Sequence, residues 1–147
     1  MNLSERLNED MKQAMRNQDK FKLTTIRMVR AAIKNLEIDQ KRTLNDDEVL
    51  DILSREIKQR KDALQEFTKA GREDLADNLK AEIDIIAGYL PEQLSEEEIK
   101  VIVQQTIQET GASSKADIGK VMSKLMPKVK GRADGKLVNQ AVQQLLQ

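Results

Sequence analysis

The sequence predicts an all-α protein in two parts, an N-terminal antiparallel helical bundle followed by a small three-helix domain. Apolar residues recur at helix spacing almost from end to end, which is the pattern of amphipathic helices packed on a core. The 147 residues include only two prolines and are rich in helix-forming side chains. This length suffices for one ordinary domain or two small ones.

The first two helices are predicted on either side of a polar turn at residues 17–20. Residues 3–17 place five apolar side chains on one helix face: Leu3, Leu7, Met11, Ala14 and Met15. Residues 21–41 carry a stripe at i, i+3, i+7 and i+10: Ile26, Val29, Ile33 and Leu36. At ~1.5 Å per residue the second helix would span roughly 30 Å, the width of a small domain.

Capping and glycine signals bound the third and fourth helices. Asn45 and Glu48 are spaced as a capping box, which predicts a helix over about residues 46–70, and Gly71 stands where a C′ glycine is expected. The fourth helix is expected over residues 73–88, with four aligned apolar side chains: Leu75, Leu79, Ile83 and Ile86. Because short loops favour antiparallel neighbours, residues 1–90 predict an up-and-down bundle of about four helices.

Residues 91–94 are interpreted as the junction between the two domains. Pro91 does not fit a helix interior, and it disfavours helix at the residue before it. Ser95 and Glu98 then form a second predicted capping box. We expect helices over residues 96–110, 115–126 and 135–146, which together make residues 95–147 the small C-terminal domain. Pro127 is expected to end the second of these helices.

The composition limits the chemistry available to the chain. It contains no Cys and no His, so thiolate or imidazole metal sites and the commonest general base are missing. Acidic residues do cluster at two predicted helix starts, Asp46, Asp47, Glu48 and Asp51 at the first, and Glu96, Glu97 and Glu98 at the second. We interpret these acids as caps and partners of the helix dipole. The sequence therefore predicts no metal and no cofactor.

The sequence predicts a cytoplasmic protein with no membrane partner. The N-terminus lacks the charged-then-apolar pattern of a signal peptide. No apolar run approaches the ~20 residues that a spanning helix requires.

The net charge of zero conceals an uneven distribution. Residues 1–94 carry 17 basic and 19 acidic side chains, and residues 95–147 carry 8 and 6. Residues 115–136 alone hold seven Lys or Arg and two Asp, a local net of +5. A positive loop that leads into a helix N-terminus is a physically sensible place to hold a phosphate.

This cluster supplies the candidate nucleic-acid-binding residues: Lys124, Lys128, Lys130, Gly131, Arg132, Gly135 and Lys136. The two glycines would let the chain turn and let a phosphate approach the backbone, while Asp134 would cap the last helix. The alternative is a structural turn whose lysines are only solvated. Four phosphate contacts, by Lys128, Lys130, Arg132 and Lys136, would make the logarithm of the binding constant fall with the logarithm of salt concentration with a slope of about −3. Since residues 95–147 contain no aromatic side chain, RNA would be read by backbone and shape.

Two further basic rows are interpreted as the solvated sides of amphipathic helices. The first is Arg27, Arg30 and Lys34, which could add a phosphate contact; the second is Arg55, Lys58, Arg60 and Lys61, with acids at pairing distance. Tyr89 is expected to pack at the junction, with a hinge as the alternative. Core filling is the default for the methionines, and an exposed pair, Met122 and Met126, would instead mark a protein-partner site.

Four motifs carry a resemblance to a known family: GREDLA (71–76), YLPEQLSEEEI (89–99), GKVM (119–122) and PKVKGRADGKLVN (127–139). They resemble the GatB/YqeY family over essentially the whole chain, and most closely its free-standing YqeY-type members. The resemblance implies a two-part all-helical fold, similar to the C-terminal tail module of the B subunit of the Asp/Glu-tRNA amidotransferase. A similar module is appended to some bacterial glutaminyl-tRNA synthetases, and in these settings it is a tRNA-binding appendage.

The resemblance implies a tRNA-binding accessory module associated with tRNA-dependent amidation. The enzymes of this family are classed as carbon–nitrogen ligases that use glutamine as the amide donor. The chain lacks the B subunit's catalytic body, a G-x-x-x-x-G-K loop, His and Cys. We therefore expect no catalytic residue and no intrinsic activity. The alternative is a protein-interaction adaptor that docks on an aminoacyl-tRNA synthetase or amidotransferase without contacting RNA.

Overall fold

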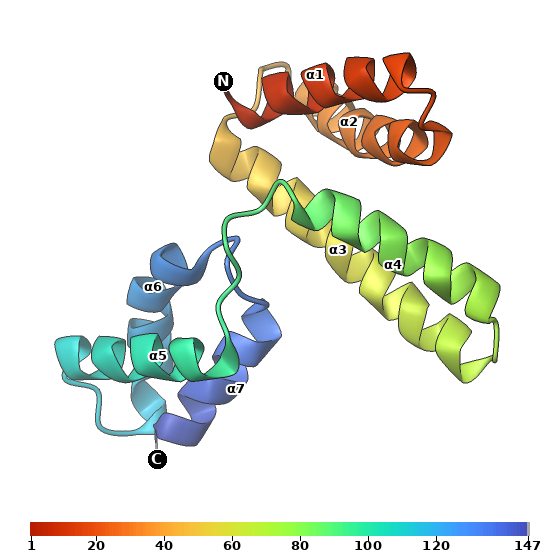
Figure 1. The fold of residues 1–147 in the computed structure, drawn as a ribbon. Helices are drawn as coiled ribbons and strands as arrows, with labels where there is room; N and C mark the ends of the chain where they lie inside the picture. The colour runs from red at the N-terminus through yellow and green to blue at the C-terminus, as the bar shows by residue number, and fades with distance from the viewer. Residues whose placement is uncertain (147) are drawn as a thin grey trace. The chain divides into compact units, whose positions relative to one another are not determined.

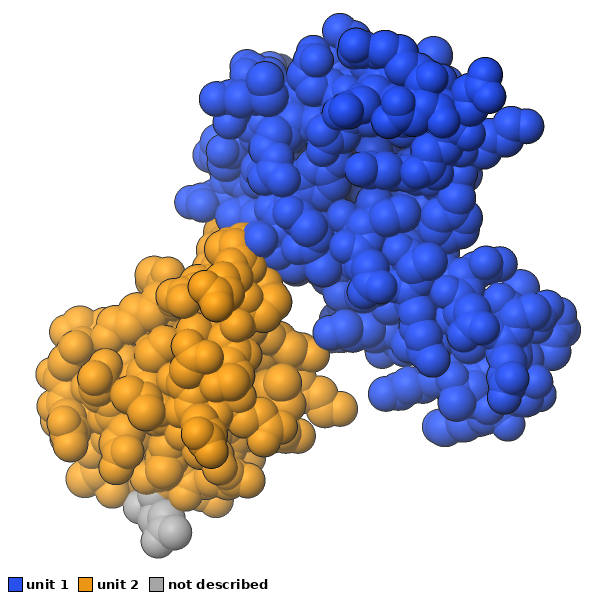
Figure 2. All heavy atoms as spheres, viewed as in Figure 1, with its two compact units in different colours: residues 1–90 blue, residues 91–147 orange. Residues whose placement is uncertain are grey.

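The computed structural model of the chain describes residues 1–146 and is all-α, as the sequence predicts. These residues form seven α-helices and one short 3₁₀ turn (Figure 1). Gln147, the last residue of the predicted C-terminal domain, lies outside the described residues. The chain divides into two compact units, Met1–Leu90 (unit 1) and Pro91–Gln147 (unit 2) (Figure 2). No helix within residues 1–146 combines the length and the apolar character needed to cross a bilayer.

Unit 1 is built from two helical hairpins. Helix α1 (Leu3–Arg16) pairs with α2 (Lys20–Gln40), and α3 (Asp46–Lys69) pairs with α4 (Glu73–Ala87) (Figure 1). The first hairpin packs on the start of α3 and the end of α4, where the core lies. The tip of the α3–α4 hairpin extends beyond this core, since no side chain in residues 61–75 is buried.

The core of unit 1 joins all four helices. The predicted apolar stripe of α2 is confirmed at Ile26, Val29 and Ile33, which are all buried. They pack with buried residues of the other helices and connections: Leu7, Leu44, Val49, Ile52, Leu53, Ile57, Ile86 and Tyr89. Removing this apolar surface from water is the main force that holds the two hairpins together.

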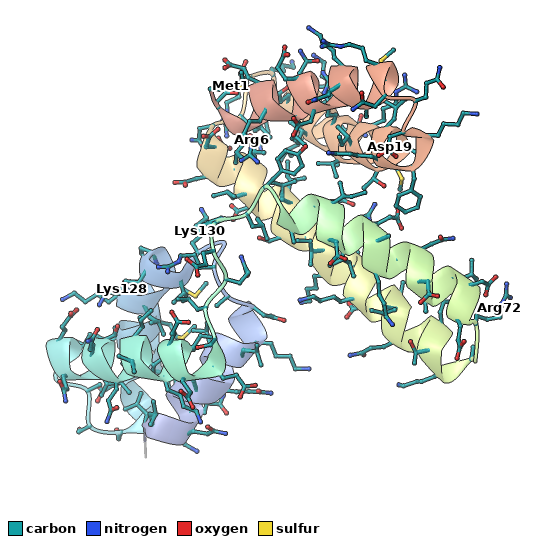
Figure 3. All side chains as sticks on the ribbon, in the orientation of Figure 1. Met1, Arg6, Asp19, Arg72, Lys128 and Lys130 are labelled. Atoms are coloured by element: carbon teal, nitrogen blue, oxygen red, sulfur yellow. The ribbon has the colours of Figure 1, made fainter. Side chains whose placement is uncertain are left out.

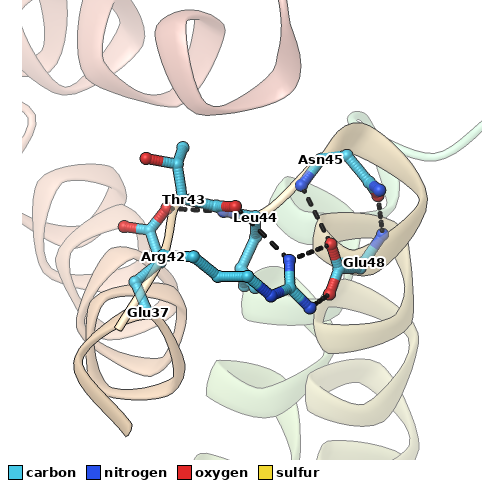
Figure 4. A network of polar contacts seen from close by, with 6 residues as sticks. All are labelled: Glu37, Arg42, Thr43, Leu44, Asn45 and Glu48. Atoms are coloured by element: carbon cyan, nitrogen blue, oxygen red, sulfur yellow. Dashed lines mark hydrogen bonds and ion pairs between the residues drawn. The ribbon is translucent and has the colours of Figure 1, made fainter. Parts of the chain in front are cut away.

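The connection between α2 and α3 is fixed by a network of polar contacts (Figure 4). The predicted capping box is confirmed, since Asn45 Oδ1 accepts from the Glu48 amide at 3.0 Å and Glu48 Oε1 accepts from the Asn45 amide at 3.2 Å. The Arg42 guanidinium also donates to Glu48, with Nη1 at 2.8 Å from Oε1. Glu37 at the end of α2 accepts from the Leu44 amide at 3.0 Å. The bonds made by Asn45, Glu48 and Glu37 satisfy amides in and just before the first turn of α3, which have no partner within the helix.

Gly71 ends α3 in the way that the sequence predicts. Its φ is +72°, in the left-handed region where an L side chain costs about 1–2 kcal/mol. The Gly71 amide donates to the Thr68 carbonyl at 3.1 Å, and the Arg72 amide donates to the Phe67 carbonyl at 2.9 Å. This pair of bonds is a Schellman motif, which satisfies carbonyls at the helix end.

Tyr89 is a packed residue of unit 1, as expected. It is only 6% exposed, and its hydroxyl donates to Asp10 Oδ2 of α1 at 2.5 Å. The Arg6 guanidinium lies 4.8 Å from the centre of the ring and donates to the Gly88 carbonyl. Burial, and then the hydrogen bond to Asp10, raise the pKa of the Tyr89 phenol. These contacts attach the end of α4 to the first hairpin.

Arg60 corrects the expectation that its row on α3 is solvated. It is 6% exposed, and its Nη1 donates to Glu56 Oε2 one turn earlier at 2.7 Å. Its Nε lies 3.8 Å from Oε1 of Glu82 on α4. The i,i+4 pairing with Glu56 could be predicted from spacing, but the burial follows from α4, which packs over this side of α3.

Unit 2 is a three-helix arrangement around its own core. It contains α5 (Glu96–Thr110), a 3₁₀ turn η1 (Lys115–Asp117), α6 (Ile118–Val129) and α7 (Gly135–Leu145). The second predicted capping box is confirmed, with Ser95 and Glu98 bonded reciprocally at 3.2 Å. The buried side chains of this core come from all three helices: Ile99, Val103, Val121, Leu125, Val129, Val138, Ala141, Val142 and Leu146.

Pro127 does not end its helix, contrary to the prediction. Helix α6 begins three residues later than expected, after the 3₁₀ turn, and it continues through Pro127 to Val129. Pro127 is exposed and lies in the last turn, so its missing amide leaves only the carbonyl of Ser123, also an exposed residue, without a helix bond. Val129 is 1% exposed in the core of unit 2, and this burial holds the last turn in place.

Candidate nucleic-acid surface

The seven residues predicted to bind nucleic acid lie on three consecutive parts of unit 2. Lys124 and Lys128 lie on α6; Lys130, Gly131 and Arg132 lie in the loop that follows; Gly135 and Lys136 open α7. Figure 3 shows Lys128 and Lys130 at the C-terminal end of α6. The local structure of each part decides which side chains present charge to solvent.

Helix α6 carries a row of three lysines, Lys120, Lys124 and Lys128, which we term the α6 lysine row. The spacing of four residues places neighbouring members on the same side of the helix. Lys120 and Lys124 are exposed. They border an open hollow between α6 and the end of α5, lined by Glu109, Thr110, Lys120, Ser123 and Lys124. Lys120 was not among the predicted residues, although the i, i+4, i+8 spacing was visible in the sequence.

Lys128 is already held by α5. Its ammonium donates to Glu109 Oε2 at 2.9 Å and to Thr106 Oγ1 at 3.1 Å, and the residue is half-buried. The hydrogen bond from Lys128, then its charge, and more weakly the charge of Lys124, lower the pKa of the Glu109 carboxyl. A phosphate would have to compete with Glu109 for this ammonium. Sequence reasoning missed Glu109 because it lies on another helix, far from Lys128 along the chain.

The chain leaves α6 through a type II β-turn. The Arg132 amide donates to the Val129 carbonyl at 2.9 Å. Between them, Lys130 has φ −57° and ψ 124°, and Gly131 has φ +74°. A type II turn requires a positive φ at its third position, so glycine is needed there for the backbone. The turn presents Lys130 to solvent at its second position.

Residues 92–94, which precede α5, hold this loop in place. The Leu94 amide donates to the Arg132 carbonyl at 2.7 Å, and Gln93 Nε2 donates to the Gly131 carbonyl at 2.8 Å. The Arg132 Nε lies 3.4 Å from the Glu92 carbonyl, to which it donates. Arg132 is half-buried and therefore serves first as a structural residue of the loop. No local sequence signal links residues 92–94 to a loop about forty residues away.

The start of α7 is capped by Asp134, as predicted. Its Oδ1 accepts from the Lys136 amide at 2.9 Å. Gly135 is the first residue of α7 and is not among the positive-φ glycines; a Cβ there would meet no atom within 4 Å. The expectation that both glycines turn the chain is thus correct only for Gly131. The Asp134 carboxylate also opposes an anion at this helix start, because it already occupies the positive end of the dipole.

The surface can therefore bind anions through ammonium groups, which act on phosphates as point charges. Within residues 1–146, no group of three or more acidic side chains is arranged to hold a metal ion. The three aromatic residues of the chain, Phe21, Phe67 and Tyr89, all precede unit 2.

The chain is similar to a known protein family and to several known proteins. A family model described as "Yqey-like protein" matches residues 4–146. Three similar proteins share the name "Altered inheritance of mitochondria protein 41, mitochondrial". That of Pyrenophora tritici-repentis is 33% identical over 146 residues, covering 96% of this chain and 79% of the relative. That of Lachancea thermotolerans is 40% identical over 111 residues, covering 74% and 59%. That of Vanderwaltozyma polyspora is 46% identical over 85 residues, covering 57% and 46%. The matched region thus spans most of the first relative but only about half of the other two.

Proposed function

The chain belongs to the Yqey-like protein family, and from this premise we propose that it is a tRNA-binding accessory module whose unit 2 grips the phosphate backbone. In this proposal the module serves tRNA-dependent amidation, as its resemblance to the tail of the amidotransferase B subunit implies. It has no catalytic centre of its own and acts by holding tRNA for a partner enzyme. The observation that carries the proposal is the group of exposed lysines on α6, in the loop after it and at the start of α7.

Four exposed lysine residues supply the phosphate contacts: Lys120, Lys124, Lys130 and Lys136. We term them the four surface lysines. This set differs from the one expected from the sequence, because Lys128 is held by Glu109 and Arg132 donates to the backbone of Glu92. Lys128 joins the contacts only when a phosphate displaces Glu109. Arg132 contributes by fixing the loop that carries Lys130.

The proposed mode of recognition is shape and backbone, without base stacking. Unit 2 has no aromatic ring, and proteins that read single-stranded RNA commonly stack bases on such rings. Contacts to phosphates fix register and orientation and carry no sequence information. The target in this proposal is therefore a folded tRNA stem or elbow, and tRNAs of different sequence should bind with similar affinity.

The compartment is part of the proposal. The sequence predicts a cytoplasmic protein, whereas the relatives carry "mitochondrial" in their name. Both compartments contain tRNA, so the proposed activity suits either. Imaging of the tagged full-length protein in its own organism decides between them, and a location outside both would contradict a role in tRNA amidation.

A filter-binding titration with deacylated tRNA at low salt tests the proposal. The four surface lysines are replaced by Ala together, and a matched control replaces four exposed lysines of unit 1: Lys58, Lys61, Lys69 and Lys80. Both variants lose the same positive charge, so a difference between their tRNA affinities shows that the position of the four surface lysines matters. We expect the first to lose more than about tenfold in affinity and the control to change much less.

Absence of tRNA binding at low salt, or equal losses in the two variants, would falsify the proposal. A pull-down after nuclease treatment tests the alternative that the chain is a protein-interaction adaptor. If it retains a synthetase or amidotransferase while the chain has no tRNA affinity, the adaptor is favoured.

A further inference from the structure

The solvent-exposed residues of α2 repeat every seven positions. From Lys20 to Ile38 the exposed residues form three successive triplets: Lys20, Phe21 and Thr24; Arg27, Met28 and Ala31; Lys34, Asn35 and Ile38. Contact residues along a helix that packs on another in a coiled coil have the same seven-residue spacing. The opposite side of α2 is already packed, because Ile26, Val29 and Ile33 are buried in unit 1.

The triplets correspond to defined heptad positions. Position a holds Phe21, Met28 and Asn35; position d holds Thr24, Ala31 and Ile38; position g holds Lys20, Arg27 and Lys34. We term these nine residues the α2 seam. The a and d residues of a coiled coil form its apolar contact, and the g residues pair with charges on the partner.

The large apolar members of the α2 seam are exposed to solvent. Phe21 is 41% exposed, Met28 is 48% exposed and Ile38 is 64% exposed. Single exposed apolar residues are ordinary, but these three lie on one helix face at a and d positions. Thr24 and Ala31 are small, which would let the backbone of a partner helix come close. Asn35 at an a position is the type of residue that fixes register.

The charge of the α2 seam selects an acidic partner. Residues 20–34 contain five basic side chains and no acidic one: Lys20, Lys22, Arg27, Arg30 and Lys34. Three of the five occupy g positions beside the apolar line. A helix that presents Glu or Asp opposite these positions would gain an ion pair at each heptad.

A second copy of this chain does not complement the α2 seam. In a parallel pair, Lys20, Arg27 and Lys34 would face the partner's e positions, which are Thr25, Ala32 and Asp39. Only the last of these is acidic. In an antiparallel pair the g cations would face one another and repel. Charge therefore argues for a different protein.

We propose that the α2 seam docks an amphipathic α-helix of a partner protein, one with apolar a and d residues and an acidic flank. This proposal does not rest on the tRNA proposal, since the surface belongs to unit 1 and uses other residues. A helix fits the surface better than RNA does, because Phe21 is the one ring of the α2 seam and the other exposed apolar members, Met28 and Ile38, are aliphatic side chains in line with it along the helix.

The probe for this site is a synthetic helical peptide of three heptads with Leu at a and d and Glu at e and g. A second peptide carries Lys in place of Glu. Fluorescence anisotropy with the full chain is expected to show the Glu peptide binding at least about tenfold more tightly. The charge-swap variant K20E/R27E/K34E should reverse this preference. The matched control K58E/K61E/K80E changes net charge equally at exposed sites elsewhere in unit 1 and should keep it.

Met28→Asp tests the apolar part of the α2 seam. Because Met28 is exposed, the variant should keep the circular dichroism and thermal unfolding of the parent while losing at least about tenfold in affinity for the Glu peptide. No binding of the Glu peptide, equal binding of both peptides, or full binding by Met28→Asp would overturn the proposal. Two other outcomes would also overturn it: self-association that Met28→Asp abolishes, or a loss of tRNA affinity in the charge-swap variant that exceeds the loss in the matched control.

Discussion

The ammonium of Lys128 on α6 donates to the carboxylate of Glu109 on α5 at 2.9 Å. Glu109 also borders the open hollow beside Lys120 and Lys124. The basic surface of unit 2 thus contains an internal competitor for any phosphate that approaches it. This ion pair engages Lys128, whereas Lys120 and Lys124 on the same helix are exposed.

Replacing Glu109 by Gln is expected to raise tRNA affinity about two- to fivefold at low salt, because it removes a negative charge that repels the phosphates and competes for Lys128. The gain should shrink as salt is added, since ions screen exposed charges. Filter binding measures the gain in affinity. Glu97→Gln, at an exposed position on the same helix, is the charge-matched control. An equal gain in both variants would show that only net charge matters.

Acid should weaken unit 2 in part through Glu109. Its pKa lies below the ordinary value of 4.5 in the folded protein, chiefly because Lys128 donates to it. The folded state therefore favours the carboxylate, and the resulting stability is present above pH 4.5 and lost as pH falls through the folded-state pKa. Urea unfolding at neutral and acidic pH measures the loss, which should be smaller in Glu109→Gln. An identical loss in this variant would contradict the assignment.

Because the chain has a single tyrosine, its titration reports on the contact between Tyr89, at the end of α4, and Asp10 of α1. Burial and the hydrogen bond to Asp10 raise the pKa of Tyr89 above its ordinary value of 10.0. Stability from this group is present below pH 10 and falls as pH rises toward the folded-state pKa, because the unfolded chain releases the proton first. Tyrosinate absorbance should appear at higher pH in the native protein than in urea. Asp10→Ala removes both the acceptor and the charge and should lower the native midpoint, and an unchanged midpoint would show that Asp10 does not raise this pKa.

The two loop glycines should respond differently to alanine. Gly131→Ala places a side chain at φ +74° and is expected to cost about 1–2 kcal/mol of stability. Gly135→Ala meets no atom within 4 Å at a helix start and should be neutral or slightly stabilising. Thermal unfolding of both variants makes the comparison. A larger cost at Gly135 than at Gly131 would contradict the turn described above.

The parts of the fold that could be predicted from sequence are those set by local interactions. The caps at Asn45 and Ser95, and the C′ glycine at Gly71, each depend on residues within one or two turns. The burial of Arg60 and the continuation of α6 through Pro127 depend instead on packing by distant segments. Helix α4 covers Arg60, and the core of unit 2 holds Val129, so neither outcome is visible in a short stretch of sequence.

The candidate site shows the same division. The basic cluster itself was predictable from the positions of its lysines, and Lys120 could have been found by extending their spacing. The engagement of Lys128 by Glu109 and the attachment of Arg132 to residues 92–94 join segments far apart in the chain. Of the α2 seam, only Arg27 and Lys34 were predicted to be solvated, as members of a basic row. Core filling was the default prediction for Met28, which is instead 48% exposed, because helix spacing alone does not tell an exposed methionine from a buried one.

The salt dependence of tRNA binding tests the central claim most directly. The full chain is titrated with deacylated tRNA between about 50 and 200 mM salt, where each neutralised phosphate adds about 0.7 to 0.9 to the magnitude of the log–log slope. Contacts by the four surface lysines predict that the logarithm of the binding constant falls with the logarithm of salt concentration with a slope of about −3. Each lysine replaced by Ala should make this slope shallower by nearly 1. A flat salt dependence, or a slope that survives removal of all four lysines, would contradict the claim that this surface binds tRNA.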